Sequence, residues 1–133
     1  MTDLAQPMHV HIRDGQGMVT PEPYRRSVVV VLSPLLQPEL EGTGVMAGYS
    51  EVAPGQHGSR HNHPNEAEVW MFFAGTGRAI VGDEEYFTEP GSVVYTPPGV
   101  YHQFFNEGDE TVKLFWYYTP PGAERAVLEG AFR

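Results

Sequence analysis

Glycine and proline punctuate this chain from end to end and separate short apolar segments. The 133 residues include 15 glycines and 12 prolines. Short apolar runs between such residues are typical of an all-β protein. Many short antiparallel strands joined by turns favour a sandwich or a closed barrel. The expected strands are 9–13, 27–32, 45–52, 59–61, 68–73, 77–81, 84–88, 92–96, 102–106 and 112–118.

The length fits one domain, with helix expected only near the C-terminus. Segment 122–128 has the composition of one or two helical turns, and 38–41 could form a helix that is short at best. We expect an N-terminal arm or edge strand over 1–20, followed by a single barrel domain over 21–133. The arm is polar, and a strand within it could pair with a second subunit, because unpaired sheet edges seek partners.

Charge and cysteine content exclude several classes of function. The net charge of −9 argues against a nucleic-acid partner, because phosphate binding needs a basic face. The absence of cysteine rules out disulfides, zinc-thiolate sites, iron–sulfur clusters and cysteine nucleophiles. The longest apolar run, 28–32, is far too short to span a membrane. No signal peptide is recognised at the N-terminus, so the expected location is the cytoplasm.

Three histidines and one glutamate form the most informative cluster. His61 and His63 are two residues apart, a spacing that puts both rings on one face of a strand. Glu68 follows a turn at 64–65, and His102 begins a later strand. Such a donor set suits Mn, Fe, Co, Ni, Cu or Zn rather than calcium. A histidine pair of this kind also occurs by chance, so the surrounding sequence has to decide.

The surrounding sequence resembles the two motifs of the cupin superfamily. Segment 55–75, Gly55-x5-His61-x-His63-x4-Glu68-x6-Gly75, is similar to the first motif. Segment 91–106, Gly91-x5-Pro97-x-Gly99-x2-His102-x3-Asn106, is similar to the second. The resemblance implies a small single-domain cupin, which is an antiparallel β-barrel of the jelly-roll type. It also implies that His61, His63, Glu68 and His102 bind one divalent transition-metal ion.

Three further residues are candidates for a catalytic role. Glu66 has the same parity as Glu68, and it is a possible base, an alternative ligand or a solvated loop carboxylate. His57 precedes the first ligand and could reach a substrate or lie on the surface. Tyr49, or its neighbour Glu51, could present a polar group at the rim of the pocket. His9 and His11 are expected to be structural.

Strand alternation predicts the wall of a substrate pocket. An inward Glu68 brings Trp70 and Phe72 inward, and an inward His102 brings Phe104. Tyr95 or Tyr117 could add a hydroxyl. Arg78 and Arg60 are cations that could hold a carboxylate, although alternation places Arg60 opposite His61. An aromatic wall suits a flat substrate, but these side chains could equally be ordinary core.

A metal with four protein ligands keeps positions for water, dioxygen or a chelating substrate. We therefore expect a metal-dependent enzyme acting on a small oxygenated organic molecule, and prefer a dioxygenase over an isomerase, cyclase or lyase. The alternative is a non-catalytic small-molecule-binding or sensor protein. Neither the metal nor the substrate can be named from sequence. The resemblance to cupins also implies a homodimer, and segment 27–32 could form either its interface or the barrel wall.

Overall fold

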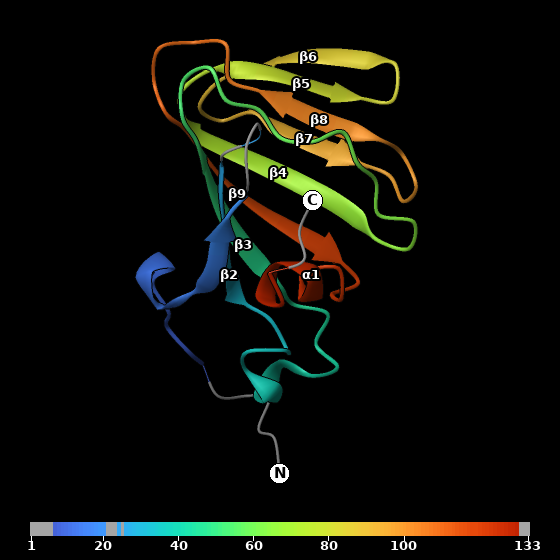
Figure 1. The fold of residues 1–133 in the computed structure, drawn as a ribbon. Coiled ribbons are helices and arrows are strands. Elements are labelled where there is room, and N and C mark those ends of the chain that lie inside the picture. Colours follow the sequence, from blue (N-terminus) through green and yellow to red (C-terminus); the bar gives the residue numbers. More distant parts are fainter. Residues whose placement is uncertain (1–6, 21–23, 25, 131–133) are drawn as a thin grey trace.

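The computed structural model describes residues 7–20, 24 and 26–130, and their strands form two antiparallel sheets (Figure 1). The large sheet has the order β1 (Gln16–Val19), β2 (Arg26–Leu32), β3 (Ala47–Val52), β9 (Val112–Thr119), β4 (Ala67–Ala74) and β7 (Val93–Thr96). The small sheet has the order β6 (Glu84–Thr88), β5 (Gly77–Val81) and β8 (His102–Phe105). The expected all-β, antiparallel jelly-roll fold is confirmed.

Helix is confined to short segments. A single turn, α1 (Arg125–Leu128), lies near the C-terminus as expected, and Pro38–Leu40 forms a 3-10 turn. Val127 of α1 joins the hydrophobic core. In the part of the chain that the structure describes, no helix has the length and hydropathy needed to cross a membrane.

The N-terminal segment differs from the prediction. Instead of a strand over 9–13, residues Ile12–Asp14 form a 3-10 turn. The ring of exposed His11 accepts a hydrogen bond from the Arg13 amide, and the Asp14 carboxylate accepts one from the His11 amide. This local capping competes with strand pairing. The edge strand forms later, as β1, and it pairs with β2 of the same chain.

The core lies between the two sheets. Its side chains come from alternate positions of the strands, and they include Val28, Val30, Trp70, Phe72, Ala79, Val81, Phe104, Leu114 and Trp116. Gly48 is required for this packing, because a Cβ there would lie 2.3 Å from the indole of Trp116. Gly75 and Gly91, which are positions of the two motifs, both have positive φ angles, of 75° and 99°.

The opposite side of the large sheet is also rich in apolar side chains. One row crosses five strands through the pairs Val29↔Tyr49, Tyr49↔Phe115, Phe115↔Met71 and Met71↔Val93. Val93 is 65% exposed and Tyr95 is 58% exposed. We call this surface the outer sheet face, defined by Tyr49, Met71, Phe73, Val93, Tyr95 and Phe115. Segment 27–32 serves both faces, since Val28 and Val30 are in the core while Val29 lies outside.

The segment that precedes the first ligand runs along β8. Gly58 donates its amide hydrogen to Phe104 O, and His61 and His102 exchange two backbone hydrogen bonds. The sequence predicted a strand over 59–61, but the structure has no regular strand there. The segment contributes a single bridge between His61 and His102. This bridge brings a residue before β4 beside a residue 41 positions later.

Candidate metal centre

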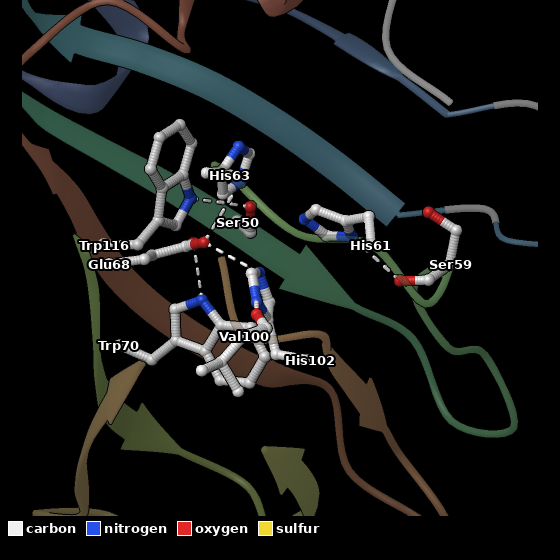
Figure 2. A network of polar contacts seen from close by, with 9 residues as sticks. All are labelled: Ser50, Ser59, His61, His63, Glu68, Trp70, Val100, His102 and Trp116. Atoms are coloured by element: carbon white, nitrogen blue, oxygen red, sulfur yellow. Dashed lines mark hydrogen bonds and ion pairs between the residues drawn. The ribbon is translucent and has the colours of Figure 1, made fainter. Parts of the chain in front are cut away.

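Four side chains converge between the two sheets (Figure 2). His61 and His63 come from the segment before β4, Glu68 from β4 of the large sheet, and His102 from β8 of the small sheet. One donor atom from each lies within 4.8 Å of the other three. Ligands about 2 Å from one ion are separated by about 3 to 4 Å, so these separations are of the size that a metal site needs.

Backbone carbonyls fix the orientation of two of the imidazoles. Nδ1 of His61 lies 2.9 Å from Ser59 O, and Nδ1 of His102 lies 3.2 Å from Val100 O. A carbonyl oxygen can only accept, so each Nδ1 must carry the proton. The lone pair of each ring is then on Nε2, which is the tautomer that a metal ligand requires.

The carboxylate of Glu68 is oriented by an indole. Nε1 of Trp70 donates a hydrogen bond of 2.6 Å to Oε2 of Glu68. The residues alternate along β4, so both point inward from the same strand. This bond leaves Oε1 facing the imidazoles, 2.9 Å from Nε2 of His102 and 3.3 Å from Nε2 of His63.

Three of the donor atoms are buried without an aligned hydrogen bond in the described part of the chain. These atoms are Oε1 of Glu68, Nε2 of His63 and Nε2 of His102. Buried polar atoms are normally satisfied, because an unmatched one costs about 1 to 3 kcal/mol. A cation at the point where the three atoms converge would satisfy all of them, so the donor set fits a metal ion.

The electrostatics of the site also suit a cation. Burial and, after it, the neighbouring His102 lower the pKa of His61 to about 4, so the ring is neutral at neutral pH. Burial alone would raise the pKa of Glu68, but the imidazoles of His102 and His63 hold it below its usual range. A neutral imidazole and an ionised carboxylate are the forms that bind a divalent metal.

A narrow cavity adjoins the site. Its polar lining comes from Arg26, Ser50, His61, Glu68 and Tyr118. Its apolar lining includes Val28, Trp70, Phe104, Leu114 and Trp116. The free volume is about 20 Å³, and a site for one water molecule needs about 10 to 15 Å³. Only a small ligand, or the small end of a larger one, fits beside the donor atoms.

The residues predicted to form the substrate pocket divide into two groups. Trp70 and Phe104 line the cavity, and Phe72 packs behind Phe104 with a ring separation of 5.1 Å. Arg78 and Tyr95 do not belong to the pocket. Arg78 points outward between buried Gly77 and Ala79 and pairs with Glu85 and Glu107. Tyr95 also points outward, because its neighbours Val94 and Thr96 are the inward residues of β7.

Tyr49 lies on the wrong side of the sheet for catalysis at this site. Its ring packs against Phe73 and Phe115 on the outer sheet face, and its hydroxyl donates a 2.8 Å hydrogen bond to Glu51. The inward residue of β3 is the neighbouring Ser50, which lines the cavity. Arg60 is likewise outside the cavity lining and stacks over Tyr101.

The other two catalytic candidates have different surroundings. His57 stacks on Phe105 at 5.3 Å and contacts Tyr24, outside the cavity lining. Glu66 is half-buried, and its Oε2 is enclosed. It lies near enough to contribute to the raised pKa of Tyr118. A catalytic role for either residue remains a prediction.

Besides Ser50, the polar cavity-lining residues Tyr118 and Arg26 were missed by sequence reasoning. Tyr118 was passed over for Tyr117, although Leu114, Trp116 and Tyr118 share the parity that points into the core. Its ring contacts that of His63 at 4.6 Å. Arg26 was missed because it precedes the apolar segment, yet it has the same parity as Val28 and Val30. The signal for both was strand alternation counted from the buried residues.

Removing a ligand tests the assignment of the metal centre. His61→Ala and His102→Ala should each reduce bound metal to below about a tenth of the wild-type amount, because one donor is lost from a four-donor site. Elemental analysis after dialysis measures this, with circular dichroism to establish that the fold persists. The exposed His9→Ala variant is the control. Wild-type metal content in both ligand variants would refute the assignment.

Removing the indole donor tests how Glu68 is oriented. Trp70→Phe should weaken metal binding about 10- to 100-fold, because partners of the ligands commonly contribute that much. Competition with a chelating dye measures the affinity. Trp116→Phe is the matched control, since its buried Nε1 donates to Ser50 rather than to a ligand. Equal effects of the two substitutions would show that packing, and not the bond to Glu68, is responsible.

Solved structures similar to this chain share its fold. A predicted oxalate decarboxylase from Thermotoga maritima superposes with a TM-score of 0.73 at 16% identity, over 86% of this chain and all of that one. A cupin-2 domain of Rhodospirillum rubrum gives a TM-score of 0.70 at 24% identity, over 87% and 76% of the two chains. KdgF from a Halomonas species gives 0.68 at 14% identity, over 89% and 99%. At these identities the likeness establishes the fold.

Sequence comparison identifies the family. A segment of 63 residues is 30% identical to the mannose-1-phosphate guanylyltransferase RfbM of Salmonella typhimurium. That segment is 47% of this chain but only 13% of the length of RfbM. Residues 48–118, more than half of the chain, match the family model described as the cupin domain. With its fold and both motifs in agreement, the chain belongs to the cupin-domain family.

Proposed function

We propose that this protein is a divalent-metal-dependent enzyme acting on a small oxygenated organic substrate that chelates the metal. The observation that carries the proposal is the convergence of Oε1 of Glu68 and Nε2 of His63 and His102, all buried and none in an aligned hydrogen bond among the described residues. A purely structural cluster would gain from pairing these atoms. Their arrangement instead leaves three lone pairs available to one cation.

A bound divalent ion would supply Lewis acidity or, if redox-active, one-electron chemistry with dioxygen. The protein supplies a hydrogen-bond donor in the adjoining cavity. Burial raises the pKa of Tyr118 well above its usual value, and the charge of Glu68 adds to this effect. Tyr118 therefore stays protonated at neutral pH and can donate a hydrogen bond to a substrate oxygen in the cavity.

Two reaction classes fit these residues. The dioxygenase preferred from the sequence requires the metal site and room for a small chelating substrate. Isomerase, cyclase or lyase chemistry requires a proton acceptor as well as a donor. The enclosed carboxylate of Glu66, near Tyr118, favours this second class. A binding or sensor protein is the non-catalytic alternative.

Oxygen consumption and proton exchange separate these possibilities. Protein loaded with Fe²⁺ is offered small 2-oxo and 2-hydroxy acids in an oxygen electrode. Protein loaded with Mn²⁺ is incubated anaerobically with the same compounds in D₂O, and NMR detects deuterium entering the carbon beside the carbonyl. We expect metal-dependent turnover in one arm. Chelator-insensitive binding with turnover in neither arm would support a non-catalytic protein.

Glu66→Gln then tests the proposed base. If Glu66 accepts the proton, the substitution should lower turnover by about 10² to 10⁴-fold while metal content is unchanged. The exposed Glu84 of β6 provides the matched control, Glu84→Gln. Turnover within about twofold of wild type in Glu66→Gln would make Glu66 a bystander.

We also propose that two copies of the chain pair through the outer sheet face. The exposed Val93, Tyr95 and Phe73 make this face apolar on a chain whose net charge is −9. Glu51 and Lys113 are paired across β3 and β9 beside the apolar row. When two copies meet about a two-fold axis, Glu51 of one copy can lie opposite Lys113 of the other, so that opposite charges are matched.

One exposed substitution tests this pairing. Val93→Lys should convert a dimer into a monomer, because it places a charge within an apolar interface. Light scattering coupled to gel filtration measures the mass. Phe87→Lys is the control, since Phe87 is 69% exposed on β6 of the small sheet. A monomeric wild-type protein would contradict the proposal.

A further inference from the structure

We infer that Arg26 is a specificity-determining residue that binds a carboxylate of the substrate, so the substrate class is small 2-oxo or 2-hydroxy acids. The inference deepens the proposed function and rests on it. While Arg26 binds the carboxylate, the hydroxyl or carbonyl oxygen on the adjacent carbon would reach the proposed metal. Arg26 is neither a motif position nor a metal ligand.

The fold delivers the guanidinium to the cavity from the large sheet. Arg26 is the first residue of β2 and pairs with Val52 of β3. It has the inward parity of Val28, and it lines the same cavity as His61 and Glu68. Its Nε and Nη2 atoms are enclosed.

Gly58 makes room for this side chain. A Cβ built on Gly58 would lie 3.3 Å from Cζ and 3.4 Å from Nε of Arg26. Gly58 is fixed against β8 by the hydrogen bond from its amide to Phe104 O. A larger residue at position 58 would therefore press on the guanidinium. The segment before His61 therefore packs closely against the side chain that β2 contributes to the cavity.

The charges in the cavity favour an anion. Burial lowers the pKa of Arg26, and the proximity of Tyr118 and Glu68 opposes this effect, yet a guanidinium stays protonated in proteins. Glu68 is the carboxylate in the cavity lining, and Glu66 lies nearby. A divalent ion and the guanidinium of Arg26 both place positive charge beside the cavity, and this favours an anionic ligand over a neutral one.

Geometry and size together favour a carboxylate as the anion. A guanidinium has five donors in a planar fork, which matches two oxygens of a carboxylate or a phosphate, and the planar carboxylate is the smaller of these groups. The free volume of about 20 Å³ leaves room for few atoms between the fork and the metal ligands. A hydroxyl or carbonyl on the carbon next to the carboxylate is the shortest bridge to the metal. Of the arginines described, Arg60 and Arg78 are outside this cavity, on Tyr101 and on Glu85 and Glu107.

Glycolate and glycolamide provide a matched pair of probes, because they differ only in the charged group. Protein loaded with Co²⁺ is titrated with each, and the visible absorption of the metal reports binding. Wild-type protein should bind glycolate at least about tenfold more tightly, since a hydrogen bond between two charged groups is stronger than one to a neutral amide. Arg26→Gln should weaken glycolate binding about tenfold or more and leave glycolamide within about twofold. Arg60→Gln, the control, should change neither.

The outcomes are distinct from those that test the metal centre. Glycolate binding of wild-type strength in Arg26→Gln, or no preference for glycolate in the wild type, would overturn the inference. Failure of the wild type to take up Co²⁺ would instead refute the proposed metal enzyme. In that case calorimetry on metal-free protein still shows whether glycolate binding depends on Arg26. If Arg26→Gln does not fold, Arg26→Lys replaces it, with weakened glycolate binding expected because the planar fork is lost.

Discussion

The buried carboxylate of Glu68 is the constraint around which the rest of the structure is arranged. A carboxylate removed from water needs several donors or a cation. Trp70 provides one donor to Oε2, and the imidazoles of His63 and His102 lie beside Oε1 without aligned hydrogen bonds among the described residues. The four side chains therefore carry a negative charge and hold their donor atoms in fixed orientations, which are the properties of a centre that binds a metal.

The jelly roll positions this centre by joining its two sheets at one place. Glu68 belongs to the large sheet and His102 to the small sheet, and the backbone bridge between His61 and His102 fixes the first histidine against the second. The same bridge lets the Ser59 and Val100 carbonyls orient both rings. Donor geometry thus follows from main-chain pairing, which is less easily disturbed than side-chain contacts alone.

Alternation along the strands assigns opposite roles to neighbouring residues. Ser50 and Tyr118 line the cavity, while Tyr49 lies on the outer sheet face with the row that includes Phe115. A shift of one residue along β3 or β9 would exchange these surfaces. The same strand register therefore places the polar cavity residues on the inner face of the large sheet and the apolar residues on its outer face. A change of register would alter the proposed catalytic surface and the proposed pairing surface together.

The sequence by itself determined the all-β class and which four side chains meet. Frequent glycine and proline limit element length, and the spacing of His61, His63 and Glu68 repeats a family pattern in which the fold is already implied. Inward placement of Trp70 and Phe104 followed from the two-residue period of a strand.

Only the tertiary structure decided which cation and which tyrosine share the cavity. Arg26 is 35 residues before His61, and Tyr118 is 16 residues after His102. Nothing local relates these residues to the motifs, because sheet order, rather than sequence distance, makes β2, β3, β9 and β4 neighbours. Arg78 and Tyr95 are close to the motifs in sequence, but they lie outside the cavity because alternation along β5 and β7 turns them outward. Which residues of different strands lie close together depends on how distant strands pair. The residue pattern of a single strand does not contain this information.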